Sequence, residues 1–500
     1  MPARRTIVSL LNCLAFLALS WGAVASADAP TIEREESWQV LFLGGQRVGY
    51  ARMLIDPRQR DGQTIVRSAN EMHMTLKRFG QTLRMATELV SDETLDGDLL
   101  TFTFEMKNPP ATTTKTTGTV DGKDLKLVTE INGRRQNSTS PWTPGVKSPA
   151  YQDRLLRLNP LKPGETKTFE AFVPEFNKAA KITIAAGDTE AVTLLDGKEA
   201  KLQKIKVTNS LMPGIVMDAW IDEKGESVKS VTPMLGIEMV TYTVSRDEAM
   251  RQIDVAELDL GVSTLVKTKR IANPYETRKA VYRITISNDS PVKIIPTGDT
   301  QSVKPGATDD TAELTVTALP LPKSARVEPV DKEFLASTSF LQCDDEKVQE
   351  HAQKAAGNLT DPAQIARAME KYVRDKLTNK NFSTALASAA EVARNLEGDC
   401  TEHACLLAAM LRAKQIPSRV AVGLVYVEGP SAFGGHMWTE ANLDGKWVPL
   451  DGTLGRGGTG ATHIKLGDAT FADEAAAPLS SFANLLTVIG KLKIDVVSVE

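Results

Sequence analysis

The chain has 500 residues, of which 42% are hydrophobic and 24% charged, and its formal net charge is −4. At about 150 residues per domain this length predicts roughly three domains, and the composition is that of an ordinary globular protein with more than one core. Because the charge is mild and no basic block concentrates it, nucleic acid is not expected as a partner.

The first 27 residues have the pattern of a signal peptide. A basic start at Arg4-Arg5 precedes a mostly apolar stretch, Ile7 to Trp21, and the small residues Ala25-Ser26-Ala27 fit a cleavage site. The pattern predicts an exported protein, periplasmic or secreted, and leaves open a retained membrane anchor or twin-arginine export. Since no later stretch is long and apolar enough to cross a bilayer, we expect no stable membrane span after cleavage.

Residues 31–250 are predicted to form a large antiparallel sheet or a partial barrel. Strand-like runs such as Leu99 to Met106 and Leu202 to Val207 are separated by turn pairs such as Asp121-Gly122 and Asp196-Gly197. This region carries no recognisable catalytic motif. Two interpretations stay open, a platform that docks a substrate or partner and a scaffold that covers hydrophobic surface of the C-terminal part.

Residues 255–335 form a second strand-rich segment, whose clearest strand pattern runs from Tyr282 to Ile286. The sequence does not decide whether this segment is a small β-sandwich or the end of the preceding domain. A stiff, extended connector, Leu319-Pro320-Leu321-Pro322, follows it.

Residues 336–500 are predicted to be an α+β domain. The pairs Asp344-Asp345 and Asp361-Pro362 have the features of helix N-caps. After these helices the valine-rich run from Arg419 to Val427 is typical of a strand. Helices followed by an antiparallel sheet define the α+β class.

A further helix is predicted to begin at Cys400. Gly398-Asp399 precedes this cysteine, and an apolar run from Ala404 to Leu411 follows it. A cysteine at a helix N-terminus feels the partial positive charge of unpaired N–H groups, which favours the nucleophilic thiolate. Three cysteines lie beyond the signal segment, Cys343, Cys400 and Cys405, and an odd number in an exported chain indicates a free thiol.

An imidazole and a carboxylate are predicted to meet on one hairpin. Asp444-Gly445 is the strongest short hairpin signal, and a two-residue turn there pairs Leu443 with Lys446. In that register His436 and Asp451 are diagonal neighbours on one sheet face. The carboxylate can then orient an imidazole that takes a proton from Cys400, as in covalent acyl transfer.

The runs GDCTEHACLLAAMLRAKQIPSRVAVGLVYV and GGHMWTEANLDGKWVPLDGT resemble the core of the transglutaminase-like superfamily, which has a papain-like Cys-His-Asp arrangement. The resemblance covers residues from about Leu396 to Thr453 and extends toward Phe340 and the C-terminus. It implies Cys400 as nucleophile, His436 as general base and Asp451 as orienting acid. The family includes cross-linking acyltransferases, cysteine proteases, amidases and members without activity.

Other uses of these residues are less favoured. Cys400 and Cys405 lie about 140° apart around a helix axis, so both cannot bind one small metal ion. His403 is expected to pack or to support the site. The glycines between Gly455 and Gly460 lack the strand-to-helix context of a phosphate-binding loop. We therefore expect neither a metal nor a cofactor.

The residues together predict an exported cysteine-dependent enzyme that acts on amide bonds of peptides or proteins through a thioester intermediate. Its reaction is either hydrolysis, as in a protease or amidase, or transfer to an amine, as in a cross-linking transglutaminase. The expected substrate is a peptide or protein with an amide carbonyl, and a cell-envelope protein is a candidate partner. The alternative is a catalytically silent scaffold or binding protein of the cell envelope.

Overall fold

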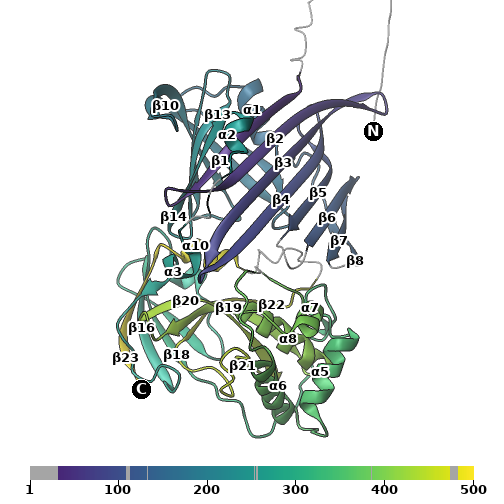
Figure 1. Cartoon of the computed structure of the whole chain (residues 1–500), viewed down its shortest axis with the longest axis vertical. Coiled ribbons are helices and arrows are strands. Elements are labelled where there is room, and N and C mark those ends of the chain that lie inside the picture. The colour runs from purple at the N-terminus through teal and green to yellow at the C-terminus, as the bar shows by residue number, and fades with distance from the viewer. Residues whose placement is uncertain are drawn as a thin grey trace, which may run out of the picture.

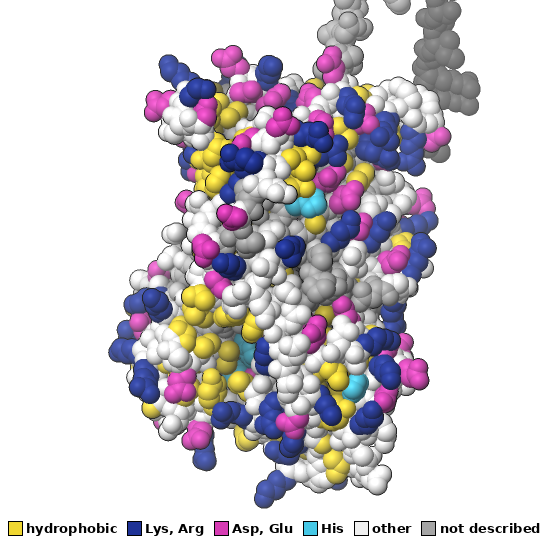
Figure 2. All heavy atoms as spheres, in the orientation of Figure 1, with side chains coloured by type: hydrophobic (Ala, Val, Ile, Leu, Met, Phe, Trp, Pro, Cys, Tyr) yellow, Lys and Arg dark blue, Asp and Glu magenta, His cyan; other side chains and the backbone are white. Residues whose placement is uncertain are grey.

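The computed structural model describes residues 32–107, 113–131, 133–252, 254, 257–383, 386–472 and 482–500. The expected signal peptide lies outside these residues. The chain folds into two lobes, an upper lobe of long strands and a lower lobe in which helices lie beside smaller sheets (Figure 1). Acidic and basic side chains are mixed over both lobes on the face shown in Figure 2, as the mild net charge suggests.

The upper lobe is one 14-stranded antiparallel sheet, in the order β8-β7-β6-β5-β4-β3-β2-β1-β14-β13-β12-β11-β10-β9. Its strands are β1 (Glu35–Leu43), β2 (Gln46–Arg60), β3 (Gln63–Arg78), β4 (Gln81–Thr94), β5 (Leu99–Lys107), β6 (Thr113–Asp121), β7 (Asp124–Ile131), β8 (Arg134–Pro141), β9 (Thr166–Val173), β10 (Lys178–Thr193), β11 (Glu199–Asn209), β12 (Val216–Ile221), β13 (Ser227–Met234) and β14 (Ile237–Val244). The helices α1 (Tyr151–Leu158) and α2 (Arg246–Ala249) accompany the sheet. The expected β-rich N-terminal region is thereby confirmed.

Alternating apolar residues explain why these segments form a half-buried sheet. In β5 the side chains of Phe102, Phe104 and Met106 are buried, and they pack in one cluster with residues of neighbouring elements such as Phe172. A period of two places such residues on one face of a strand. Lys147 bridges both Asp98, beside β5, and Ala171, in β9. The sheet therefore curls far enough for its β9 edge to approach β5.

The lower lobe contains two sheets. The five-stranded sheet has the order β15-β20-β19-β22, with β21 paired to β20, and the four-stranded sheet has the order β17-β18-β16-β23. Their strands are β15 (Val266–Lys267), β16 (Lys279–Ile286), β17 (Gln301–Pro305), β18 (Thr311–Thr317), β19 (Ser418–Val427), β20 (Ala432–Leu443), β21 (Lys446–Leu450), β22 (His463–Ala469) and β23 (Leu492–Val499).

The segment 255–335 shares its structure with the C-terminal part of the chain. Its strand β16 pairs with the C-terminal strand β23, and β15 pairs with β20. Tyr282 of β16 packs edge-on against Phe433 of β20 in a common core. The boundary expected between residues 335 and 336 therefore does not coincide with a break between sheets, because non-local strand pairing joins the two segments.

The helices of the lower lobe are α3 (Leu260–Ser263), α4 (Pro291–Ile294), η1 (Lys332–Phe334), α5 (Glu346–Ala356), α6 (Pro362–Lys376), α7 (Ala389–Asn395), α8 (Cys400–Ala413) and α10 (Ala483–Val488). Of these, α5, α6 and α7 pack against α8. Asp345 and Asp361 cap α5 and α6 with their side chains, as predicted. Every residue of α8 from Thr401 to Arg412 is buried, which is typical of a helix inside a core.

Among the helices of the described residues, none combines the length and the apolar character needed to cross a membrane.

Candidate active site

The hairpin formed by β20 and β21 has the predicted register. Leu443 pairs with Lys446, and the pairing continues regularly to Thr439 and Leu450. Asp444 and Gly445 both have positive φ, 52° and 73°, as a type I′ turn requires. This register places His436 and Asp451 on one face, where His436 Nε2 donates a hydrogen bond of 2.8 Å to Asp451 Oδ2.

Cys400 is the first residue of α8, as predicted. Asp399 caps the helix in a capping box. Its side chain accepts a hydrogen bond from the Thr401 backbone N–H, and the Glu402 side chain accepts one from the Asp399 backbone N–H. Gly398 precedes the cap with φ at 143°, and a Cβ there would stand 2.3 Å from the Glu402 Cβ. Glycine is thus required for the close turn that leads into the helix.

The thiol of Cys400 is free and half-buried, and it interacts with His436. Burial by itself lowers the pKa of the His436 imidazole. The negative charges of Asp451 and Cys400 and hydrogen bonds to both outweigh burial and raise this pKa to about 10. Because Asp451 engages Nε2, Nδ1 is the ring nitrogen that remains to exchange a proton with the thiol. The arrangement therefore favours a protonated imidazole beside the Cys400 thiol.

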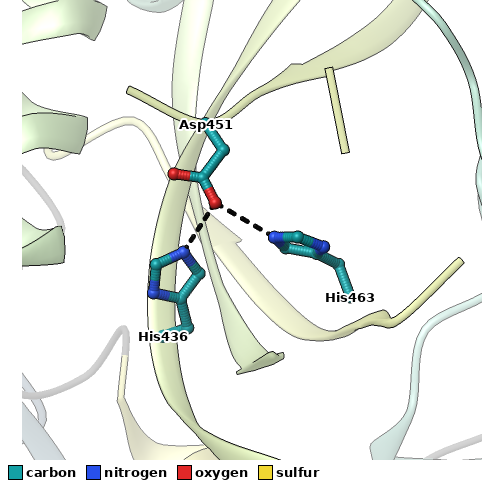
Figure 3. Close-up of side chains that lie close together, drawn as sticks. All are labelled: His436, Asp451 and His463. Carbon is teal, nitrogen blue, oxygen red and sulfur yellow. Dashed lines mark hydrogen bonds and ion pairs between the residues drawn. The ribbon is translucent and has the colours of Figure 1, made fainter. Parts of the chain in front are cut away.

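Asp451 is fully buried directly after β21 and accepts four hydrogen bonds. One oxygen accepts from His436 and from His463, at 2.8 and 3.0 Å, and the two side chains approach it from different strands (Figure 3). The other oxygen accepts from the backbone of Thr453 and Leu454. Burial alone would raise the pKa of Asp451, but the two histidines more than offset it and hold the pKa well below its ordinary value.

His463 and Glu370 also belong to the site, and the sequence reasoning missed both. His463 begins β22, which reaches the site only by pairing with β19. Glu370 lies on α6, and its Oε1 accepts from the backbone of Asp451 and of Gly458 at 2.9 and 3.1 Å. Burial raises the pKa of Glu370 to about 7. The only local signal was an acidic residue directly after Met369, in the helix predicted to begin at Asp361-Pro362.

Other residues on α8 and β20 take supporting positions. His403 is fully buried, and its ring bonds to the Asp399 carbonyl and to Lys380 Nζ. Burial and the charge of Lys380 lower the pKa of His403 to about 4, so its ring is neutral. Cys405 is fully buried among apolar side chains. Trp438 stacks on His436 with ring centroids 6.2 Å apart and shields one side of the imidazole.

Three side chains of the site could hold a metal ion. His436, Asp451 and His463 offer ligand atoms that lie within 4.8 Å of one another. In the described geometry, however, Nε2 of each imidazole points at Asp451 Oδ2, so both nitrogens donate protons to the carboxylate. A bound cation needs these nitrogens as deprotonated ligands. The observed hydrogen bonds therefore fit a carboxylate that orients two imidazoles better than a metal centre.

Comparison with known proteins gives a family match and several distant structures, among them the following three. A model of the transglutaminase-like superfamily matches residues 349–452. A candidate cysteine protease from Cytophaga hutchinsonii is 18% identical with a TM-score of 0.31, and the match covers 44% of this chain and 86% of that chain. A β-barrel-like protein with a domain of unknown function from Brucella abortus is 10% identical with a TM-score of 0.28, over 42% and 96% of the two chains.

A candidate protease from Parabacteroides distasonis is 14% identical with a TM-score of 0.18, and the match covers 68% of this chain and 64% of that chain. A comparison with curated protein sequences finds no match.

Proposed function

Residues 349–452 belong to the transglutaminase-like superfamily, and from this premise we propose that the chain is an exported cysteine-dependent enzyme acting on amide bonds. One observation carries the proposal. The His436 imidazole lies between the Asp451 carboxylate, at 2.8 Å, and the Cys400 thiol at the start of a helix. These are the nucleophile, base and orienting groups that covalent acyl transfer requires.

The first half of the proposed reaction forms a thioester. The Cys400 thiolate attacks the carbonyl carbon of an amide, and the carbonyl electrons move to oxygen. The Cys400 backbone N–H lies in the first turn of α8, where amides have no partner within the helix, and it stabilises the oxyanion. As the oxyanion collapses, the C–N bond breaks and His436 gives its proton to the departing amine.

The second half releases the acyl group. Neutral His436 takes a proton from water or from a second amine, which attacks the thioester carbonyl, and the Cys400 thiolate leaves. Water gives hydrolysis, and an amine gives a new amide. Asp451 keeps the imidazole oriented throughout and favours its protonated form. The acceptor that dominates depends on how well the site excludes water.

Labelling with a thiol-reactive peptidyl ketone tests the proposal. The probe should modify Cys400 in the wild-type chain, and labelling should be lost in Cys400→Ala and strongly reduced in His436→Ala. Cys343→Ala is the matched control, since Cys343 is also a half-buried free thiol and its replacement should leave labelling unchanged. Absent labelling of Cys400, or equal labelling in His436→Ala, would support a catalytically silent scaffold instead.

A second experiment separates the two reactions. The chain is incubated with a glutamine-containing peptide and a primary amine, and the products are identified by mass spectrometry. Amine adducts indicate transfer, and shortened or deamidated peptides indicate hydrolysis. The same reaction with Cys400→Ala should yield neither product.

Export is a separate element of the proposal, supported by the signal-like pattern of the first 27 residues. N-terminal sequencing of the mature protein from a periplasmic or secreted fraction should begin after Ala27.

A further inference from the structure

The hairpin formed by β3 and β4 extends from the upper lobe to the lower lobe (Figure 1), where it contacts the residue before Cys400. Its turn residues Phe79 and Gly80 both have positive φ, 48° and 79°, as in a type I′ turn. Asp259, the N-cap of α3, accepts hydrogen bonds from the backbone of both turn residues at 2.8 and 2.6 Å. The tip of the hairpin is therefore held in a defined position.

The same hairpin contacts the loop after α6. Gln81 donates from Nε2 to the Lys380 carbonyl at 3.1 Å, and its Oε1 accepts from the Phe382 backbone at 2.7 Å. The rings of Phe79 and Phe382 lie 4.8 Å apart. This loop also lies beside the turn that precedes Cys400, because the Asn379 carbonyl accepts a hydrogen bond of 3.0 Å from the Gly398 backbone N–H.

Arg78, the last residue of β3, makes the most direct contact with the site. Its Nη2 forms an ion pair of 2.7 Å with Asp399 Oδ2, and the two side chains are 22% and 2% exposed. The other Asp399 oxygen accepts from the Thr401 backbone and caps α8. A buried carboxylate one residue before a nucleophilic cysteine disfavours the thiolate unless a cation offsets its charge.

We propose that Arg78 is a positioning residue of the active site, which neutralises Asp399 and adds positive charge beside Cys400, so that the N-terminal sheet is needed for a reactive thiolate. This inference rests on the proposed function, since it assigns a role in activating the same cysteine. In this proposal the upper lobe increases the reactivity of Cys400, which neither a docking platform nor a passive scaffold would do.

The charges around Cys400 support this role. Positive groups face it from three elements: Arg78 from β3, Lys380 from the loop after α6 and His436 from β20. Negative or acidic groups on its own helix are Asp399 and Glu402, and Asp451 lies beyond His436.

Burial lowers the pKa of Arg78, but its interactions with Asp399, Cys400 and Glu402 more than offset this and raise it.

The test is the pH dependence of Cys400 alkylation by iodoacetamide, followed by mass spectrometry of the Cys400 peptide in the full chain. Arg78→Gln should move the midpoint of reactivity to higher pH by about one unit, the size expected for losing one nearby opposite charge. Arg78→Lys keeps the charge, so its midpoint should lie close to the wild-type value. Arg67→Gln is the matched control, since Arg67 lies on the same strand and pairs with Asp92 at 2.7 Å, away from the site.

A double variant provides a second measurement. Asn caps helices about as well as Asp, so Arg78→Gln combined with Asp399→Asn should shift the midpoint less than Arg78→Gln alone. An unchanged midpoint in Arg78→Gln, or equal shifts in Arg78→Gln and Arg67→Gln, would overturn the inference while the proposed function stands. If wild-type Cys400 does not react at all, the proposed function itself fails. Should Arg78→Gln not fold, a wild-type midpoint in Arg78→Lys supports the role of the charge, and a shifted midpoint contradicts it.

Discussion

Replacing Asp451 with asparagine should lower the pKa of His436 by at least two units. The substitution keeps the size of the side chain and an oxygen that accepts from the imidazole, but it removes the negative charge 2.8 Å from Nε2. A change in the pKa of His436 then reflects the lost charge of Asp451 and not a change in side-chain volume.

The magnitude follows from the local electrostatics. Raising the His436 pKa from 6.5 to about 10 corresponds to about 5 kcal/mol in favour of the imidazolium. Attraction between unit charges 2.8 Å apart is about 6 kcal/mol at an effective dielectric constant of about 20. Asp451 therefore supplies most of the effect that overcomes burial, and without it only the interaction with Cys400 opposes burial.

The sign of the stability effect follows from the same shift. The folded-state pKa of His436 lies above its ordinary value of 6.5, so the imidazolium stabilises the folded chain fully below about pH 6.5. This contribution is lost as the pH rises through about 10. In Asp451→Asn the upper edge of this window should move to lower pH, and unfolding experiments between pH 7 and 10 should show an earlier loss of stability.

Imidazole NMR with labelled histidine is the direct assay. The chain has five histidines, and His436→Gln assigns the His436 signal. Asp444→Asn serves as the control, because it makes the same chemical change in the turn of the same hairpin, where Asn-Gly is also favoured. A His436 midpoint in Asp451→Asn within about half a unit of the wild-type value would refute the assignment of the raised pKa to Asp451.

Three further outcomes are expected. Gly398→Ala should abolish Cys400 labelling and lower stability, because the added Cβ meets the Glu402 Cβ at 2.3 Å; wild-type labelling would contradict this account of the turn. Arg154→Met should cost about 3–5 kcal/mol in urea unfolding, since it leaves the fully buried Glu93 without its partner at 2.8 Å, and a loss below about 1 kcal/mol, as for a surface pair, would contradict this. Prolonged dialysis against EDTA should leave the rate of Cys400 alkylation unchanged, whereas a loss restored by zinc would favour a metal at the two histidines and the aspartate.

The hairpin that carries the imidazole and the carboxylate could be predicted from the sequence because its geometry is local. Asp444-Gly445 determines the turn, the turn determines the register, and the register places His436 and Asp451 on one face. The start of the cysteine helix is local in the same way, since Gly398-Asp399 and the apolar run after Cys400 determine where the chain turns and where the helix begins.

Only the tertiary structure decided which distant groups surround this local geometry. His463 reaches Asp451 through pairing of β22 with β19, and Glu370 through packing of α6. Arg78 comes from another lobe, more than 300 positions before the residue with which it pairs. The pairing of β16 with β23 could likewise not be predicted from the sequence. Turns and helix caps are encoded by contiguous residues, whereas these contacts depend on how completed elements pack, and no short sequence pattern records that packing.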